Sequence, residues 1–357
     1  MSDEKLGVAI IGCGNIAGPY ARDLAAYPQI NLVGFSDLDY PRAEALAEQY
    51  HGRAYRSIDE MLADKAVELV VNLTIHHAHT EVVTRCLEAG KHVHSEKPLS
   101  LTYEEAASLV KLAKEKGLRL GCSPFTFMGE AQQTAWKLIN EGRLGPVRVV
   151  YAEVNHGRIE SWHPAPGPFY QVGALFDVGV YPLTILTAMF GPARKVLAYG
   201  RVLYPDRITK EGVAFHIDTP DFVAAAIELQ NGTLVRLTTN FYVSGKTKQR
   251  GIEFHGDLAS LHLSSWQVFD ATVEYAEFGQ SYEPVSLVKE PYHGTEWGRA
   301  VLDMAAAIRQ NRPHRATGEQ AAHVVEILCA IAKSVETGRP VELQSDFLAP
   351  TMMEWAL

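Results

Sequence analysis

The stretch that decides the fold is Leu6-Gly7-Val8-Ala9-Ile10-Ile11, followed directly by Gly12-Cys13-Gly14-Asn15-Ile16-Ala17. The first six residues are typical of a buried parallel strand, and the next six follow the pattern G-x-G-x-x-A. In this context the glycines let backbone N–H groups approach a pyrophosphate at a helix N-terminus, where unpaired donors and a partial positive charge gather. The stretch therefore predicts a Rossmann domain that binds NAD or NADP through Gly12, Gly14, Asn15, Ile16 and Ala17.

An acidic residue follows the second expected strand, Asn31–Ser36. Asp37 lies 23 residues after the second loop glycine, close to the spacing at which an acid meets the hydroxyls of the adenosine ribose. A carboxylate there would repel the additional phosphate of NADP, and the adjacent Leu38 offers no cation, so the pair favours NAD. Arg42 or Arg53 could still fold in to bind that phosphate. The alternative is that Asp37 only caps a turn before the next helix.

Length and composition indicate an ordinary soluble protein with two domains, or with one domain that carries a large appendage. The 357 residues exceed what one hydrophobic core usually organises, and 47% are hydrophobic while 21% are charged. A formal net charge of -9 argues against sequence-independent binding of nucleic acid, which needs clustered Lys and Arg. No apolar run has the length that crosses a bilayer, and the charged start Met1–Lys5 leaves no room for a signal sequence. We therefore expect a cytoplasmic protein with no nucleic-acid or membrane partner.

The cysteines and clustered histidines give no sign of a disulfide or a metal site. Cys13, Cys86, Cys122 and Cys329 are widely separated and form no C-x-x-C pair, so free buried thiols are expected. Cys13 lies at a helix N-terminus, where its pKa could fall, but a small residue filling a tight turn is the favoured alternative. The histidines of the segment 76–79 lie on an irregular loop with no carboxylate at a helpful spacing, so we expect no metal there.

The element order changes near Ser123. Before it, strands and helices alternate, with strands expected at Val67–Leu73, Lys91–His94 and Arg119–Cys122 and capping boxes at Ser57-Ile58-Asp59-Glu60 and Thr102-Tyr103-Glu104-Glu105. After a helix at about Gly129–Glu141, strand follows strand, at Val147–Asn155, Lys195–Val202, Phe222–Leu229 and Leu234–Phe241. Helices at Trp297–Gln310 and Gly318–Glu336 close the chain. The fold class expected is α/β: a doubly wound parallel sheet in residues 1–123 and an α/β domain with an open, mainly antiparallel sheet in residues 124–357.

A lysine follows the expected strand Lys91–His94, in Ser95-Glu96-Lys97-Pro98. This places Lys97 at the carboxyl edge of a parallel sheet, where open α/β sheets bind their ligands, and Pro98 favours an extended backbone there. A lysine held beside a nicotinamide could hydrogen-bond a substrate hydroxyl or carbonyl and exchange a proton with it. The alternative is a solvated surface lysine in a proline turn, the commoner situation for this residue type.

A second set of polar groups lies in an apolar stretch, Gly173–Tyr181. Asp177 and Tyr181 are four residues apart, which places them on one face of a helix whose neighbours are mostly apolar. Tyr181 paired with Lys97 could take up the proton lost when an alcohol becomes a ketone, while Asp177 orients the substrate or holds the lysine charged. A core tyrosine bonded to a structural aspartate is the alternative.

These motifs resemble the Gfo/Idh/MocA family of NAD(P)-dependent oxidoreductases over most of the chain. The matching segments are Gly12–Ala17, Ala89–Pro98 (A-G-K-H-V-x-x-E-K-P), Gly142–Gly145 (G-x-[IL]-G), Gly173–Tyr181 (G-G-x-x-x-D-x-G-x-[HY], with Val172 in place of the first Gly) and Thr337–Val341. Tyr181 stands where the family often has His, and this resembles the branches of glucose–fructose oxidoreductase, aldose dehydrogenase and dihydrodiol dehydrogenase. The segment 74–79 keeps the final His of the family pattern T-P-x-x-x-H but lacks its Pro.

The resemblance implies hydride transfer between NAD(P) and a secondary alcohol or ketone of a sugar, polyol or related diol. It implies that the open sheet makes a homodimer or homotetramer, and that Lys97, Asp177 and Tyr181 are catalytic. The implied cofactor-binding residues outside the glycine loop are Asp37, Leu38, Thr74, Ile75, His76, His79, Glu96, Lys97 and Trp162. The implied substrate-binding residues are Lys97, His156, Arg158, Trp162, His163, Asp177 and Tyr181.

Two other functions stay open at this point. Some relatives use tightly held NAD to oxidise a sugar transiently, eliminate its aglycone and reduce the product, so a glycosidase is one alternative. A nucleotide-sensing regulator that keeps the fold without the chemistry is the other. The presence of Lys97, Asp177 and Tyr181 together argues against the regulator.

Overall fold

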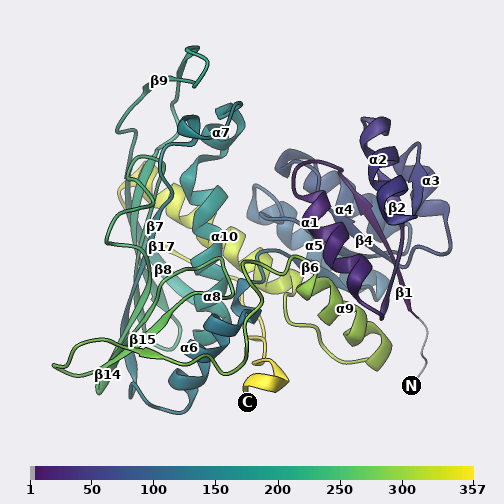
Figure 1. Cartoon of the computed structure of the whole chain (residues 1–357). Helices are drawn as coiled ribbons and strands as arrows, with labels where there is room; N and C mark the ends of the chain where they lie inside the picture. Colours follow the sequence, from purple (N-terminus) through teal and green to yellow (C-terminus); the bar gives the residue numbers. More distant parts are fainter. Residues whose placement is uncertain (1–4) are drawn as a thin grey trace. The chain divides into compact units, whose positions relative to one another are not determined.

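The computed structural model describes residues 5–357 and divides them into two compact units (Figure 1). Unit 1 comprises the chain up to Phe125 together with Glu296–Val325, and unit 2 comprises Thr126–Thr295 together with Glu326–Leu357. The first division falls two residues from the predicted boundary after residue 123. The structure differs in that a later segment, Glu296–Val325, groups with the N-terminal unit.

Unit 1 is built on a parallel sheet of six strands in the order β3-β2-β1-β4-β5-β6. The strands are β1 (Leu6–Ile11), β2 (Ile30–Ser36), β3 (Arg53–Tyr55), β4 (Leu69–Asn72), β5 (His92–Ser95) and β6 (Leu120–Cys122). All residues of β1 and β4 are buried, because helices cover both faces of a doubly wound sheet. The order reverses at β1, so the carboxyl ends of β1 and β4 border the crevice where such sheets bind ligands. The predicted Rossmann fold is confirmed.

Helices follow the strands of unit 1 with the expected capping. They are α1 (Ala17–Ala26), α2 (Tyr40–Tyr50), α3 (Ile58–Ala63), α4 (His79–Glu88) and α5 (Tyr103–Lys116). The Ser57 hydroxyl accepts the N–H of Glu60 at 3.2 Å, and the Thr102 hydroxyl accepts that of Glu105 at 3.4 Å, so both predicted N-caps form. Helix α5 ends at Gly117 in the left-handed conformation.

The segment Glu296–Val325 packs on helix α1. It contains α9 (Arg299–Gln310) and the first part of α10 (Gly318–Thr337). The ring centroids of Trp297 and Tyr20 are 5.8 Å apart, and the Tyr27 hydroxyl donates to Glu296 at 2.7 Å. These contacts explain why a segment so late in the chain belongs to unit 1.

Unit 2 is built on a mixed sheet of nine strands in the order β16-β15-β14-β13-β7-β12-β11-β8-β17. The strands are β7 (Val147–Asn155), β8 (Ala193–Arg201), β11 (Phe222–Leu229), β12 (Leu234–Asn240), β13 (Gly251–Gly256), β14 (Ala259–Leu263), β15 (Val273–Glu277), β16 (Glu283–Val285) and β17 (Val341–Glu342). All neighbours are antiparallel except β7 and β12. The predicted open, mainly antiparallel sheet is confirmed.

Helices α6 (Glu130–Asn140) and α8 (Val180–Phe190) cover one face of this sheet (Figure 1). Burial alternates along β11 and β12: every second side chain is buried, and the side chains between them point to the opposite face of the sheet, away from the helices. On that outer face Leu197 and Tyr199 of β8 keep 49% and 64% of their surface exposed. The sheet therefore has one buried face and one open face.

The segment before α8 departs from a regular α-helix. Helix α7 (Gly167–Ala174) contains a non-helical residue, Gly173, with φ 79°, and is followed by a π-helical turn, η4 (Leu175–Gly179). A Cβ at Gly173 would lie 2.7 Å from Thr219 Cγ2, so both the backbone and the packing require glycine here. The expected regular helix around Asp177 is thus corrected to a kinked one with a π turn.

The same stretch overturns one expectation about apolar length. Gly167–Phe190 spans 24 residues and has the length and hydropathy of a membrane-crossing helix, although no such run was predicted. In this structure 78% of its most apolar window is buried inside the protein, as in the core helix of a folded domain.

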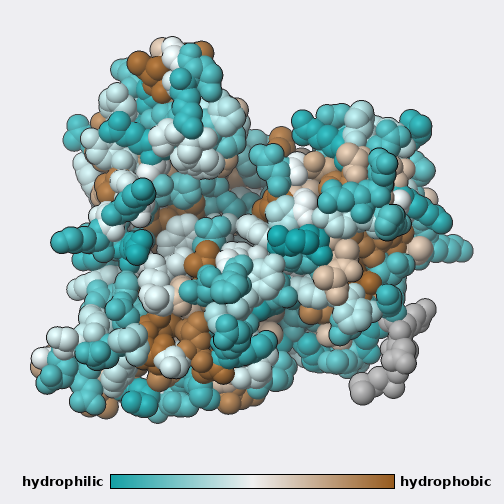
Figure 2. Space-filling view, in the orientation of Figure 1, coloured by the Kyte–Doolittle hydropathy of each residue, from teal (hydrophilic) through white to brown (hydrophobic). Residues whose placement is uncertain are grey.

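A two-stranded hairpin projects from unit 2 between β8 and β11. It pairs β9 (Asp206–Ile208) with β10 (Ala214–His216) and was not predicted. Ile208 and Val213 are 63% and 61% exposed, and Figure 2 shows apolar side chains gathered at this tip, at the top of the view.

Candidate active site

A cavity of 640 Å³ lies at the carboxyl ends of β1, β2 and β4 in unit 1. Its lining includes Ile11, Gly12, Gly14, Ser36, Asp37, Leu38, Arg42, Arg56, Ser57, Ile58, Asp59, Leu73, Thr74, Ile75, Ala78, Glu81, Val82 and Arg85. Gly12, Gly14, Asp37, Leu38, Thr74 and Ile75 of the predicted cofactor-binding set are among these residues. The structure thus brings together residues from three separate strand ends.

The two loop glycines differ in what a side chain would meet at each position. Gly12 has φ 90°, and a Cβ there would lie 2.6 Å from the backbone carbon of Leu73. Gly14 has no protein atom within 4 Å of a Cβ position, and neither its conformation nor its neighbours require glycine. The space that a side chain at Gly14 would fill is therefore available to a phosphate, which fits the approach of a pyrophosphate to this loop.

Backbone N–H groups in this loop, just before α1, are available as hydrogen-bond donors. Among the residues that the structure describes, the N–H groups of Gly14, Asn15 and Ile16 meet no acceptor, whereas Ala17 N–H donates to the Gly14 carbonyl at 3.1 Å. No side chain caps this helix. Orphan donors at an uncapped helix N-terminus fit the anionic part of a dinucleotide.

The carboxylate of Asp37 is fixed by backbone donors. Its Oδ2 accepts the N–H of Cys13 at 2.6 Å, and its Oδ1 accepts that of Asp39 at 2.7 Å. Each carboxylate oxygen has a second lone pair, so the group can still accept ribose hydroxyls. Asp37 therefore both holds the glycine loop and faces the cavity, which combines the two alternatives considered from the sequence.

Arginines at the rim of this cavity differ from the expected pair. Arg53 bonds Asp64 at 2.7 Å, whereas Arg42 and Arg56 line the cavity. Arg42 pairs with Asp39 at 2.9 Å, and the guanidinium of Arg56 lies 4.4 Å from the ring centroid of Tyr40. Arg56, which sequence reasoning missed, is a further cation at the rim of this cavity.

The thiol of Cys13 behaves as a buried group. Burial, and after it the charge of Asp37, raise the pKa of Cys13 to about 12. A lowered pKa for Cys13, which its place at a helix N-terminus suggested, is therefore wrong, because the effect of desolvation is larger than that of the helix N-terminus. All four cysteines are free; Cys13, Cys86 and Cys122 are buried as expected, whereas Cys329 is half-buried.

The histidine loop supports the cavity from behind. His79 is buried, with Nδ1 2.7 Å from the Pro98 carbonyl and Nε2 3.0 Å from the Thr74 carbonyl. Burial lowers the pKa of His79. Its contacts hold the Thr74 loop against the segment that contains Lys97, and the ring of His76 contacts that of His77 at 4.5 Å. Within residues 5–357 no group of three or more His, Cys, Asp or Glu could hold a metal ion.

Lys97 is half-buried and follows β5 at the carboxyl edge of the sheet. The preceding Glu96 is buried, with Oε1 accepting from the Tyr20 hydroxyl at 2.9 Å and Oε2 accepting from the Lys97 N–H at 3.1 Å. The Tyr20 oxygen also lies 2.9 Å from Ser123 Oγ. Glu96 thus orients the backbone at Lys97, and Tyr20 and Ser123, which sequence reasoning missed, fix Glu96.

Asp177 and Tyr181 lie in unit 2, on η4 and α8. Tyr181 is 8% exposed, and its ring centroid lies 4.9 Å from that of Trp266, a neighbour with no sequence signal. Asp177 is half-buried within the π turn. Such turns occur often at functional sites, because the extra residue redirects the side chains around it.

The expected substrate segment forms an aromatic cluster in unit 2. The ring of Trp162 lies 5.8 Å from that of His156 and 5.4 Å from that of His163, and Phe169 contacts both Trp162 and His163. Trp162 is 48% exposed. The structure therefore brings together three of the predicted side chains and adds Phe169.

Arg158 packs on two tyrosines outside that cluster. Its guanidinium lies 4.9 Å from the ring centroids of both Tyr204 and Tyr242. Nearby, Arg207 of β9 is fully buried and bonds Glu160 at 2.7 Å and Asp221 at 2.5 Å. This ion triad joins the hairpin to the substrate segment.

Comparisons with known proteins agree with this architecture. Residues 6–123 match the model of an oxidoreductase family with an NAD-binding Rossmann fold, and residues 132–262 match that of the Gfo/Idh/MocA C-terminal domain.

Relatives similar to this chain are named as reductases or dehydrogenases. The chain is 27% identical over 346 residues to 1,5-anhydro-D-fructose reductase of Ensifer adhaerens, covering 94% of this chain and 98% of that protein. It is 29% identical over 203 residues to trans-1,2-dihydrobenzene-1,2-diol dehydrogenase of Mus musculus, covering 54% of this chain and 59% of that protein. The fold is similar to that of the WlbA dehydrogenase of Bordetella pertussis, solved with NADH and UDP-GlcNAcA, with a TM-score of 0.80, 20% identity, and coverage of 96% and 100% of the two chains. The chain belongs to the Gfo/Idh/MocA family and is an NAD(P)-dependent oxidoreductase.

Proposed function

We propose that this enzyme transfers a hydride between NAD(P) and a secondary alcohol or ketone of a sugar, polyol or related diol. The observation that carries the proposal is the position of Lys97, half-buried directly after β5 at the sheet edge that holds the 640 Å³ cavity. The relatives named for 1,5-anhydro-D-fructose and for a trans-1,2-diol support a substrate with neighbouring oxygen functions.

The residues of unit 1 account for cofactor binding. The N–H groups of Gly14, Asn15 and Ile16 bind the pyrophosphate, and Asp37 accepts the ribose hydroxyls, which favours NAD. Thr74 and Ile75 border the bound dinucleotide, while His79 and Glu96 hold the backbone around it. When bound, the nicotinamide supplies the site that accepts or donates the hydride.

Three side chains carry the proton chemistry. Oxidation of a carbinol requires that its hydroxyl proton leave as the hydride leaves the carbon, and the reverse reaction requires a proton donor at the same oxygen. In our proposal the Tyr181 phenol and the Lys97 amine bind this oxygen and move the proton, and Asp177 orients the substrate. Burial of Tyr181 against Trp266 restricts the phenol to a defined direction.

The aromatic cluster supplies substrate recognition. Trp162 is half-exposed and can cover the apolar face of a sugar ring, while His156 and His163 offer ring nitrogens to hydroxyl groups. Arg158 contributes indirectly, because its guanidinium packs on Tyr204 and Tyr242.

A panel of substrates with single-residue variants tests this function. Aldoses, inositols, sugar acids and cyclic trans-diols are assayed with NAD and NADP separately, by NADH or NADPH absorbance. We expect turnover of at least one carbohydrate-like alcohol, a preference for NAD, and a fall in kcat of about a thousandfold for Lys97→Met and about a hundredfold for Tyr181→Phe.

The controls separate binding from chemistry. Tyr181→Phe should bind NADH as the native enzyme does, as measured by quenching of protein fluorescence. Because Lys97 is also implied in cofactor binding, the kcat of Lys97→Met is compared at saturating cofactor. Normal turnover by Lys97→Met would refute its catalytic role. Aglycone release from glycosides added to the panel, dependent on bound NAD but without net NADH, would instead support the transient-oxidation reaction, and NADH binding without turnover of the whole panel would favour a regulator.

The proposal includes a cytoplasmic homodimer or homotetramer formed through the open face of the nine-stranded sheet. Leu197 and Tyr199 pair across the sheet with Ala226 and Ala224, which makes a row of apolar and small side chains on that face. Exposed apolar surface of this kind is typical of a subunit interface.

A further inference from the structure

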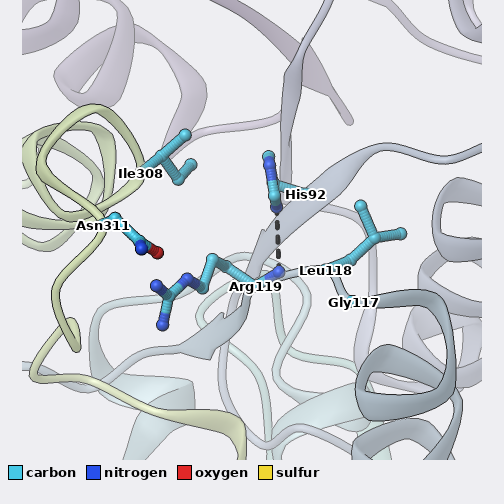
Figure 3. A pocket seen from close by; sticks show the side chains of 6 residues that line it. All are labelled: His92, Gly117, Leu118, Arg119, Ile308 and Asn311. Atoms are coloured by element: carbon cyan, nitrogen blue, oxygen red, sulfur yellow. Dashed lines mark hydrogen bonds between the residues drawn. The ribbon is translucent and has the colours of Figure 1, made fainter.

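A second cavity of unit 1, of 370 Å³, lies at the other edge of the parallel sheet (Figure 3). It is lined by His92, Gly117, Leu118, Arg119, Ile308 and Asn311. His92 begins β5, Arg119 precedes β6, and Ile308 and Asn311 lie at the end of α9. Because the strands are parallel, their first residues lie at the edge opposite to Gly12, Asp37 and Thr74. This cavity is therefore separate from the cofactor cavity.

Arg119 supplies an uncompensated charge to this cavity. The guanidinium groups of the other arginines described in unit 1 have carboxylate or aromatic partners: Arg22 with Asp23, Arg42 with Asp39, Arg53 with Asp64, Arg56 with Tyr40, Arg85 with Asp59, Arg299 with Glu296, Arg309 with Glu68, and Arg312 and Arg315 with Asp303. The guanidinium of Arg119 has no such partner among residues 5–357, although the residue is half-buried. A half-buried cation without a counter-ion favours binding of an anion.

His92 fixes Arg119 without adding a second positive charge. Its Nδ1 accepts the backbone N–H of Arg119 at 2.8 Å, drawn as the dashed line in Figure 3, so the proton of the neutral ring is on Nε2. Burial, followed by the charge of Arg119, lowers the pKa of His92, which keeps the ring neutral. The nearby Glu68 is neutralised by Arg309, whose two terminal nitrogens lie 2.9 and 2.8 Å from its oxygens. One net positive charge remains in the cavity.

Asn311 adds a neutral donor opposite that charge. It ends α9 in the left-handed conformation, with φ 51°, which asparagine tolerates better than most residues. Figure 3 shows the Arg119 guanidinium extending toward the Asn311 amide, with Ile308 on the adjacent wall. The cavity thus combines a guanidinium fork, an amide and an apolar side chain.

We propose that this cavity binds the carboxylate group of a small organic acid. The carboxylate accepts two parallel hydrogen bonds from Arg119 and one from the Asn311 amide, while the carbon skeleton packs on Ile308. A guanidinium fork matches carboxylate and phosphate alike in shape and charge, so the choice of a carboxylate rests on Ile308, whose apolar side chain a carbon skeleton can cover and inorganic phosphate cannot. The volume suits a molecule of a few carbon atoms and excludes a dinucleotide.

Calorimetric titration of the NADH-saturated enzyme with succinate tests the proposal. Saturation with NADH keeps the probe out of the cofactor cavity, and sodium chloride holds the ionic strength constant. A parallel titration uses inorganic phosphate. We expect succinate to bind, and phosphate to bind at least about tenfold more weakly because it has no carbon skeleton to pack on Ile308.

Three variants assign the binding to this cavity. Arg119→Gln should weaken succinate binding at least about tenfold. Asn311→Asp should abolish it, because the new carboxylate pairs with Arg119, and this variant decides the question if Arg119→Gln fails to fold. Arg148→Gln removes an exposed arginine of unit 2 that pairs with Asp257 at 2.8 Å, and it should bind succinate as the native enzyme does. Absence of succinate binding, unchanged binding in Asn311→Asp, or tighter binding of phosphate than of succinate would overturn the proposal.

Discussion

Gly12 and Gly14 lie two positions apart in one loop, yet substitution should affect different properties at each. Gly14→Ala adds a methyl group where no protein atom lies within 4 Å and φ is not positive, so we expect an unchanged free energy of unfolding but NADH binding weaker by about tenfold or more. Gly12→Ala forces a Cβ at φ 90° to within 2.6 Å of Leu73, so we expect a loss of roughly 1–3 kcal/mol in the free energy of unfolding. Urea unfolding and NADH titration of the two variants measure this contrast. Equal NADH affinity in Gly14→Ala and the native enzyme would contradict the role of the loop in pyrophosphate binding.

Cys13 should be unreactive in the native enzyme despite its place before a helix. With a pKa raised to about 12 by burial and by Asp37, the thiolate fraction at pH 8 is about one part in ten thousand. Iodoacetamide labelling followed by mass spectrometry should therefore leave Cys13 unmodified in the folded protein and modify it in urea. Rapid labelling in the folded protein would show that the helix N-terminus outweighs desolvation.

Single residues differ in how much of their role the sequence reveals. Asp37 and Lys97 were predictable, because each follows a strand at a position where a Rossmann sheet meets its ligands. Tyr20 and Trp266 carried no signal, because their partners Glu96 and Tyr181 lie 76 and 85 residues away in the chain. Contacts over such separations are set by tertiary packing and leave no local pattern.

At the scale of elements, the β9–β10 hairpin depends on one buried cation. Arg207 has no exposed side-chain surface, and it bonds Glu160 before α7 and Asp221 before β11. Arg207→Met would leave two buried carboxylates uncompensated, so we expect a loss of about 3–5 kcal/mol in the free energy of unfolding. Urea unfolding followed by circular dichroism measures this loss.

Arg148→Met is the matched control for that variant. Arg148 pairs with Asp257 on the surface of the same unit, at 2.8 Å. Because water solvates both charges, Arg148→Met should unfold at the same urea concentration as the native enzyme. A similar small effect of Arg207→Met would mean that the hairpin does not depend on the triad.

Elements with strong periodic or capping signals were predictable to within a few residues. β1, β7 and β11 have the predicted bounds, and the helix expected at Trp297–Gln310 is observed at Arg299–Gln310. The π turn over Leu175–Gly179 was not predictable. It follows the kink at Gly173, and Thr219, which packs against Gly173, lies 46 residues later and leaves no local pattern. The hairpin was missed because its strands have three residues each, too few for an alternation pattern.

For the chain as a whole, the order of elements in the sequence does not show which unit each element belongs to. The change from alternating elements to successive strands near Ser123 marks the end of the first stretch of unit 1, and this was visible in the sequence. The return of Glu296–Val325 to unit 1 was not visible, because its contacts, such as Trp297 with Tyr20, join residues 277 positions apart.

The open face of the nine-stranded sheet makes a prediction about subunit association. Leu197 and Tyr199, two positions apart on β8, are 49% and 64% exposed. Large apolar side chains gathered on a solvated sheet face are typical of an interaction surface. If this face is the subunit interface, Leu197→Glu with Tyr199→Glu places buried charges opposite each other and should convert the oligomer to monomers. Light scattering coupled to size-exclusion chromatography measures the mass, and circular dichroism checks that the fold is retained.

Phe278→Glu, which adds a charge at a residue 86% exposed in the turn after β15, should leave the mass unchanged. A native monomer would contradict the proposed oligomer. An oligomer that persists in the double variant would place association elsewhere, because two like charges cannot be desolvated together at the centre of an interface.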